Sequence, residues 1–464
     1  MLSPSTADLS TTVAVLVAGG GACGLVAALA AHDAGFEVVV IERDPLPRGS
    51  TSMSLGALCA AGSGDQARLG IDDDADRFTA DVMAKTNGTA DPVITTVVAR
   101  ESGPTLDWLA ATHDIPIRLD PAWPPAFGHS RARMHVTPGR SGADLMDRLI
   151  AACDRAEIPI LTEARLTDLF AADGRIAGVR YVRPDGGVED IGCGALVLAT
   201  CGFGGNPEMI AEHIPTMAAA RYFGWDGNNG DGIALARSAG AAVADMDAYQ
   251  GLGLLADPHG IDVNPRLLIE GGIQVNRAGR RFSDELADVS GQGARVIAQP
   301  DGLAWLIYDA RIAASCGDLP QYVALMEAGG VQSAANPLAL AERVGIDPDG
   351  LAQTLVDIAA GTTDPFGRAF VPPALQAPWF AIRVTGALFH TQGGLRIDAG
   401  ARVLRADGST FANLFAGGGA ARGISGTGAS GYLPGAGLCC AITLGRVAGQ
   451  NAAKILLEQA RSIR

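Results

Sequence analysis

The sequence predicts an α/β fold, and three features of the 464-residue chain support this. Residues 13–45 read as a strand, a glycine-rich turn, a helix and a second strand. Glycine is frequent, with 61 residues, and lies in short clusters between apolar runs, which indicates many tight strand-to-helix turns. The chain is also long enough for two or three domains. We therefore expect β-α-β units within a multidomain protein.

The first β-α-β unit begins in an uncharged run, residues 13–31, that is about long enough to span a membrane. Val13–Val17 is rich in β-forming residues, and three successive glycines follow it. Leu25–Ala31 is rich in helix formers. The run is thus predicted to be a strand, a turn and a helix rather than one continuous helix.

The glycine turn has the spacing of a dinucleotide-binding motif. Gly19, Gly21 and Gly24 fit G-x-G-x-x-G, and Glu42 ends the second strand, 23 residues after Gly19. Glycines admit a pyrophosphate to the helix N-terminus, where free N–H groups attract anions. The carboxylate of Glu42 can then bind a bare ribose diol. This pattern fits FAD or NAD, and a tight turn without a ligand is the alternative.

Composition limits the partners and the compartment. The formal net charge of −15 disfavours nucleic acid and anionic membranes as partners. No two of the eight cysteines have the C-x-x-C spacing of a zinc or iron–sulfur site, so we expect thiols in a reducing compartment and no metal. The N-terminal residues 1–10 lack the basic region of a secretory signal. These features predict a cytoplasmic protein.

Several further motifs resemble those of one enzyme superfamily. They are "GSTSMSLGAL", "ALVLATCGFGGNPEM", "GWDGNNGDGIALARSAGA", "GGIQVNRAGRRFSDE", "HTQGGLRID" and "NLFAGGGAARGISG". Together with the first glycine motif they follow the order found in the fumarate reductase and 3-ketosteroid dehydrogenase superfamily of FAD flavoproteins. The resemblance extends from about residue 13 to 455 and implies an oxidoreductase that binds FAD.

The resemblance also implies how the chain is divided. A Rossmann-like FAD-binding domain is expected in two parts, residues 1–245 and 386–464. An α+β cap domain for the substrate, residues 246–385, is expected between them. Helical periodicity in residues 336–361 agrees with helices in the cap.

By the same resemblance, one set of residues should bind FAD. The set is Gly19, Gly20, Gly21, Cys23, Gly24, Glu42, Arg43, Ser50, Thr51, Ser52, Asp231, Gly418 and Leu438. Asp231 could instead cap the helix that follows it. No histidine occurs between His32 and His113, so FAD should be non-covalent. Because the chain has no haem or iron–sulfur ligand set, electrons should pass to a separate acceptor: a quinone-like molecule, a protein or oxygen.

The substrate positions depart from those of fumarate reductases. Where that branch has a carboxylate-binding histidine and two arginines, this chain has Leu252, Val289 and Tyr432. Only the histidine of the "HTQGG" motif, His390, is kept. A dianion buried without paired cations is costly. Fumarate and succinate are therefore disfavoured as substrates.

The ketosteroid dehydrogenase branch accounts better for Tyr432, which stands in the glycine-rich stretch "GTGASGYLPGAG". In that branch a tyrosine and a backbone N–H bind the substrate ketone, a base removes the α-proton, and the β-hydrogen leaves as hydride to flavin N5. Tyr432 with the amide of Gly435 or Gly437 suits the ketone-binding role. His390 is the third candidate catalytic residue.

Val289 occupies the position of that branch's base, so the base must come from elsewhere. The candidates are Tyr249, Tyr308, Tyr322, His390, His129 and His135. We expect desaturation of a cyclic ketone or ketosteroid-like compound next to its carbonyl. The alternatives are reduction of an activated alkene, flavin-dependent hydroxylation, or flavin binding without catalysis.

Overall fold

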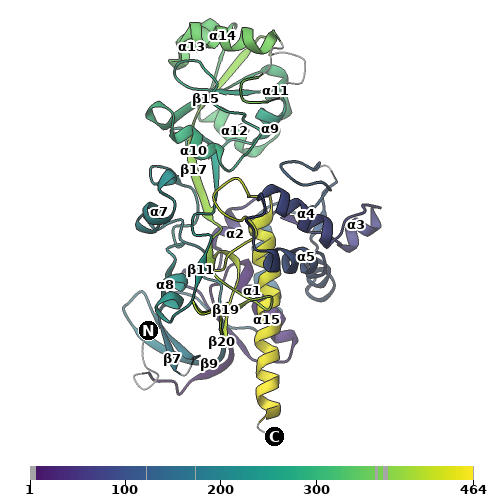
Figure 1. Cartoon of the computed structure of the whole chain (residues 1–464), viewed down its shortest axis with the longest axis vertical. Coiled ribbons are helices and arrows are strands. Elements are labelled where there is room, and N and C mark those ends of the chain that lie inside the picture. Colours follow the sequence, from purple (N-terminus) through teal and green to yellow (C-terminus); the bar gives the residue numbers. More distant parts are fainter. Residues whose placement is uncertain (1–6, 122, 173, 361–363, 369–374, 463–464) are drawn as a thin grey trace. The chain divides into compact units, whose positions relative to one another are not determined.

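The computed structural model describes residues 7–121, 123–172, 174–360, 364–368 and 375–462 (Figure 1). It contains two compact units. Unit 1 comprises residues 1–213, 224–249 and 390–464, and unit 2 comprises residues 214–223 and 250–389. Both units mix helices and strands, and the predicted α/β class is confirmed.

Unit 1 is built on an eight-stranded sheet. The strand order is β19-β20-β9-β1-β2-β6, with β8 paired to β9 and β7 paired to β8. The pairs β1–β2, β1–β9, β2–β6 and β9–β20 are parallel. The bounds are β1 Thr12–Ala18, β2 Val38–Ile41, β6 Ile160–Leu161, β7 Arg165–Ala172, β8 Arg175–Val182, β9 Val188–Leu198, β19 Arg402–Leu404 and β20 Thr410–Ala416.

Smaller pairings and helices complete unit 1. Strands β3 Leu58–Cys59, β4 Arg118–Leu119 and β5 Met134–Val136 form a three-stranded sheet, and β11 Val243–Ala244 pairs with β18 Gly394–Leu395. The helices are α1 Ala22–Asp33, α2 Gly49–Met53, α3 Gly64–Arg68, α4 Ala75–Lys85, α5 Pro92–His113, α6 Gly142–Arg155, α7 Pro207–His213, α8 Asp231–Ser238, α15 Ala436–Ser462 and the 3₁₀ turn η4 Gly418–Ala420.

The long C-terminal helix α15 packs closely against α1 (Figure 1). A Cβ at Gly445 would lie 2.4 Å from the Cys23 carbonyl oxygen, and one at Gly449 would lie 2.2 Å from that of Ala27. Both pairs are four residues apart, one helical turn, so the glycines let the two backbones approach along one face. This packing holds the N-terminal turn of α1 in place. The predicted β-α-β unit at residues 13–45 is confirmed as β1, α1 and β2.

Unit 2 contains a seven-stranded sheet in the order β13-β12-β17-β15-β14, with β10 and β16 also paired to β17. The strands are β10 Arg221–Tyr222, β12 Tyr249–Ala256, β13 Ile261–Asp262, β14 Ile273–Val275, β15 Leu303–Asp309, β16 Val331–Ala334 and β17 Trp379–Thr391. The helices are α9 Arg266–Ile269, α10 Gln292–Ile297, α11 Ala310–Ser315, α12 Pro320–Glu327, α13 Pro337–Val344 and α14 Pro348–Ala359, with 3₁₀ turns η2 Pro215–Met217 and η3 Pro300–Gly302. Helices α13 and α14 fall where the sequence predicts cap helices.

The core of unit 2 is apolar. One cluster of buried side chains includes Leu252, with the partly buried Val289 packed against it. Within the described residues, no helix is both long and apolar enough to cross a membrane. All eight cysteines are free thiols.

Candidate functional site

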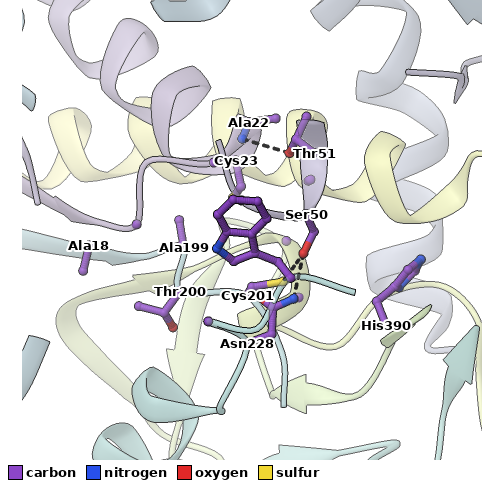
Figure 2. A pocket seen from close by; sticks show the side chains of 18 of the residues that line it. Ala18, Ala22, Cys23, Ser50, Thr51, Ala199, Thr200, Cys201, Asn228 and His390 are labelled. Carbon is purple, nitrogen blue, oxygen red and sulfur yellow. Dashed lines mark hydrogen bonds between the residues drawn. The ribbon is translucent and has the colours of Figure 1, made fainter. Parts of the chain in front are cut away.

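Unit 1 contains a cleft at the carboxyl ends of its parallel strands (Figure 2). Its lining comes from segments within residues 18–23, 41–44, 49–54, 164–166, 199–201, 225–231, 390–392, 418–423 and 437–441. In open α/β sheets, ligands bind outside these strand ends. The cleft therefore has the position expected of a nucleotide site.

The glycine turn between β1 and α1 forms one wall of the cleft. Gly19 has a φ of +111°, and a Cβ at Gly24 would lie 1.8 Å from the Gly19 carbonyl oxygen, so both positions require glycine. Gly21, in contrast, has an extended backbone with φ −75° and ψ −178°. A Cβ there would meet only Thr51 Oγ1, at 3.9 Å. The space beside Gly21 thus belongs to the cleft and not to the protein core.

Glu42 follows the last residue of β2, and its carboxylate binds the backbone of the glycine turn. Its Oε2 accepts a hydrogen bond from the Gly20 N–H at 2.7 Å, and its Oε1 accepts one from the Asp44 N–H at 2.9 Å. Burial raises the pKa of this carboxyl, although both backbone hydrogen bonds favour the ionised form. Each carboxylate oxygen keeps a further lone pair for a ribose hydroxyl.

Polar groups on the other walls fit FAD. Thr200 lines the cleft, and its buried Oγ1 has no hydrogen-bond partner among the described residues. Ser50 and Thr51 contribute hydroxyls beside the N-terminus of α1 (Figure 2), where free N–H groups favour a pyrophosphate. Burial raises the pKa of the Cys23 and Cys201 thiols, so both stay neutral.

The cleft brings together ten of the thirteen residues predicted to bind FAD: Gly19, Gly21, Cys23, Glu42, Arg43, Ser50, Thr51, Asp231, Gly418 and Leu438. The other three, Gly20, Gly24 and Ser52, are each next in the chain to a residue that lines the cleft. The Ser52 hydroxyl donates to the Gly49 carbonyl oxygen. The N-cap of α8 is Gly230, so Asp231 lines the cleft as the first residue of that helix and does not cap it.

From the motif "GWDGNNGDGIALARSAGA" sequence reasoning named only Asp231, and it missed that Trp225, Gly227 and Asn228 also line the cleft. The Trp225 indole donates to Asp44 Oδ2 at 2.6 Å, and the Arg43 guanidinium donates to the Gly227 carbonyl oxygen at 2.8 Å. Asn228 Nδ2 donates to Ser50 Oγ at 2.7 Å. The available signal was a tryptophan between glycines in "GWDGNNGDG", because an aromatic residue in such a loop has few neighbours of its own to pack on.

The rings of Tyr432 and His390 are in contact in unit 1. Their ring centroids are 5.7 Å apart and the planes meet at 74°. Burial raises the pKa of the Tyr432 phenol well above its usual range, and the backbone N–H groups of Gly437 and Gly435 oppose this rise. His390 lines the cleft, as do Gly437 and Leu438, whereas Tyr432 and Gly435 are not among the lining residues. The phenol therefore stays neutral and keeps its hydroxyl as a hydrogen-bond donor.

Gln392 fixes the proton position on His390. Its Nε2 donates to His390 Nδ1 at 2.7 Å, and its Oε1 accepts from Ser425 Oγ at 3.2 Å. The proton of the neutral imidazole is then on Nε2, which makes the ring a donor there. Burial lowers the pKa of His390 to about 4. Gly437 is required beside it, because a Cβ would lie 2.9 Å from His390 Cε1.

Four of the candidate bases have their polar atoms engaged within the protein. In unit 2, the buried hydroxyls of Tyr308 and Tyr322 bond each other at 3.0 Å. In unit 1, His129 and His135 each have both ring nitrogens within hydrogen-bonding distance of protein atoms. Tyr249, the fifth residue in this group, is buried.

Three arginines that could bind a substrate carboxylate already have partners in unit 1. Arg422 binds Asp91 and Asp245, each at 2.6 Å. Arg133 binds Asp73 at 2.7 Å and also Asp81. The Arg131 guanidinium donates to the carbonyl oxygens of Asp72 and Ser130. Among the described residues, no group of three or more His, Cys, Asp or Glu could hold a metal ion.

His129, which is buried, and His390, which is partly buried, predict an acid-sensitive fold. Burial lowers the pKa of both His129 and His390 from 6.5 to about 4; Arg133 adds to this at His129, whereas Asp81 and Asp73 oppose it. Each histidine contributes stability that is complete above pH 6.5 and is lost as the pH falls towards 4, because the unfolded chain binds the proton more tightly. The free energy of unfolding should therefore fall by at most about 3 kcal/mol per histidine over this range.

Urea unfolding between pH 7 and 4 measures this loss. His129→Gln and His390→Gln should each show a smaller fall than the wild type, since glutamine does not titrate. Equal falls in all three proteins would contradict the assignment.

Comparison with known proteins places the chain in a family. Residues 14–439 match the family model described as an FAD binding domain. A probable fumarate reductase of Shewanella frigidimarina (strain NCIMB 400) is 30% identical over 461 residues, which cover 97% of this chain and 76% of that protein. The chain belongs to this FAD-binding family, and it is an FAD-dependent oxidoreductase of the kind that acts on carbon–carbon bonds.

Two solved structures have the same fold. The open conformation of a flavocytochrome c3 fumarate reductase has a TM-score of 0.83 and 29% identity, and covers 97% of this chain and 79% of that one. The 3-ketosteroid Δ4-(5α)-dehydrogenase of Rhodococcus jostii RHA1, in complex with 4-androstene-3,17-dione, has a TM-score of 0.78 and 26% identity, and covers 97% of this chain and 99% of that one. The two structures thus represent the two branches, fumarate reductase and 3-ketosteroid dehydrogenase, of the superfamily that the sequence motifs resemble.

Proposed function

We propose that the protein desaturates a carbonyl compound, such as a cyclic ketone or ketosteroid, between the carbons α and β to the carbonyl. The observation that carries this is the contact between the Tyr432 phenol ring and the His390 ring, with the backbone N–H groups of Gly437 and Gly435 acting on the phenol. Such a group suits an oxygen that becomes negative during reaction, as a ketone oxygen does when its α-proton leaves.

In this proposal Tyr432 donates its hydroxyl proton in a hydrogen bond to the ketone oxygen. His390 Nε2–H is a second donor at the same place, and Gln392 keeps its tautomer. A base takes the α-proton, and FAD, when bound, supplies the acceptor for the β-hydrogen and its electron pair. One carbon–carbon double bond forms, and the electrons later leave to a separate acceptor, quinone-like, protein or oxygen.

The division of labour between domains is part of the proposal. Residues 1–245 and 386–464 would bind FAD, and residues 246–385 would cover the substrate. Leu252 and Val289, at the positions of cationic or proton-donating groups in the family, belong to the apolar packing of unit 2. This supports an uncharged substrate.

Reduction of an activated alkene is the second candidate. The 30% identical relative is named as a probable fumarate reductase, and the redox partner of the flavin could drive the reaction in that direction. The engaged arginines of unit 1 argue against a dicarboxylate, because a buried charge without a partner costs several kcal/mol.

Anaerobic mixing of the FAD-loaded protein with candidate substrates distinguishes the two. Saturated cyclic ketones and 3-ketosteroids should bleach the flavin absorbance, and succinate should not. Fumarate should not reoxidise the chemically reduced protein at a comparable rate. If fumarate reoxidises it and no ketone bleaches it, the desaturase proposal is wrong and the alkene reductase is favoured.

A further inference from the structure

A buried ionic network lies beside the loop that carries Tyr432. The Arg133 side chain is fully buried and binds Asp73 with two hydrogen bonds, Nε to Oδ2 at 2.7 Å and Nη2 to Oδ1 at 2.8 Å. Its Nη1 binds Asp81, and its guanidinium stacks on the Phe78 ring at 4.7 Å. Buried ion pairs seldom stabilise a fold more than apolar packing would. A contribution to stability therefore does not by itself explain why these charged side chains are buried here.

His129 joins this network to the Tyr432 loop. Its Nε2 lies 3.0 Å from the Pro434 carbonyl oxygen, and its Nδ1 lies 3.5 Å from Arg133 Nη1. A carbonyl can only accept and a guanidinium can only donate, so both neighbours require the proton to be on Nε2. The neighbouring Gly128 also packs against the loop, since a Cβ there would lie 3.1 Å from Leu433 Cδ2.

The hydrogen bond from His129 holds a peptide group that lies close to Tyr432 in the chain, since Pro434 is in the same loop. The Pro434 carbonyl and the Gly435 N–H belong to the same planar unit and point in opposite directions. The Gly435 N–H also acts on the Tyr432 phenol, because it opposes the rise in the pKa of that group. Gly435 has a φ of +79°, and a Cβ on it would lie 2.8 Å from the Cys59 nitrogen, so this backbone requires glycine. Holding the Pro434 oxygen therefore holds the Gly435 N–H and the loop that carries Tyr432.

We propose that His129, held by the Arg133–Asp73–Asp81 network, is a positioning residue that orients the Pro434–Gly435 peptide group and, with it, the loop that carries the Tyr432 hydroxyl. This proposal rests on the proposed function of Tyr432. His129 touches neither substrate nor cofactor in this role, and no proton leaves it.

Three variants in the FAD-loaded protein test the proposal. His129→Phe keeps a ring but loses the donor, whereas His129→Gln places an amide N–H where Nε2 was. Ser130→Ala is the matched control, because it removes a 2.8 Å hydrogen bond to Asp81 without touching Pro434. His129→Asn, too short to reach Pro434, replaces His129→Phe if that variant does not fold.

The first readout is the rate of flavin reduction by a saturated 3-ketosteroid or cyclohexanone. His129→Phe should lower kcat roughly 10- to 100-fold with KM little changed, the size expected when a catalytic donor is misplaced by about 1 Å. His129→Gln and Ser130→Ala should stay within a few-fold of the wild type. A His129→Gln variant as slow as His129→Phe would overturn the proposal, because packing and not the donor would then matter.

The second readout needs no substrate. Hydrogen exchange of the backbone amides in residues 431–438 should speed up in His129→Phe and not in His129→Gln or Ser130→Ala. Unchanged exchange in His129→Phe would overturn the positioning role. If no ketone bleaches even the wild type, the proposed function fails, and the exchange result still decides whether His129 orders the loop.

Discussion

Replacing Gly21 with leucine is expected to give a folded protein that carries no FAD. The backbone at Gly21 is extended, so leucine adopts it without strain. A Cβ at this position has no protein atom closer than 3.9 Å, so the leucine side chain projects into the cleft beside the N-terminus of α1. That is where the pyrophosphate is expected. The ratio of flavin to protein absorbance after purification should fall to near zero, while the thermal unfolding midpoint of the apoprotein is retained.

Two other glycines give the controls. Gly317→Leu, in unit 2, meets no atom closer than 3.6 Å and should keep both fold and flavin. Gly24→Leu places its Cβ 1.8 Å from the Gly19 carbonyl oxygen and should destabilise the fold itself. Full flavin loading in Gly21→Leu would remove the cofactor from this wall of the cleft. Acid precipitation of the wild type should release FAD intact, as expected of a non-covalent cofactor.

The repeating and local features of this chain could be predicted from its sequence. The β-α-β unit follows from apolar runs separated by glycines, and the glycine spacing is a direct steric requirement, as the contact between Gly24 and Gly19 demonstrates. The strand "ALVLAT" lies in β9 and at its carboxyl end, where Thr200 and Cys201 reach the cleft. Local backbone rules were sufficient for these elements.

Contacts between distant loops could not be predicted in this way. His129 and Pro434 are 305 residues apart, and nothing in the periodicity of either segment indicates that they meet. The pairing of Tyr308 with Tyr322 depends on how α12 packs on β15, so the sequence showed two possible bases where the structure has one buried hydrogen-bonded pair. A sequence motif can identify a candidate residue, but tertiary packing determines which other residues it contacts.

Tyr432→Phe is expected to slow flavin reduction by a ketone about 10²- to 10³-fold, the usual effect of losing one donor aimed at a developing oxyanion. The change removes the hydroxyl and keeps the ring that lies against His390. FAD should be retained, because Tyr432 lies outside the cleft lining. The measurement is the anaerobic rate of flavin bleaching by a saturated ketone, with FAD content and thermal midpoint determined on the same sample.

Tyr181→Phe is the matched control for this variant. Tyr181 is a buried tyrosine of β8 whose hydroxyl donates to Glu189 at 2.7 Å, away from the cleft lining. Both substitutions remove one phenol hydroxyl and keep the ring, so Tyr181→Phe shows what such a loss does to stability, whereas only Tyr432→Phe should affect the rate. If Tyr432→Phe bleaches as fast as the wild type and merely melts earlier, the phenol is a packing residue. The ketone would then lose its hydrogen-bond donor, and the desaturase proposal would lose the observation that carries it.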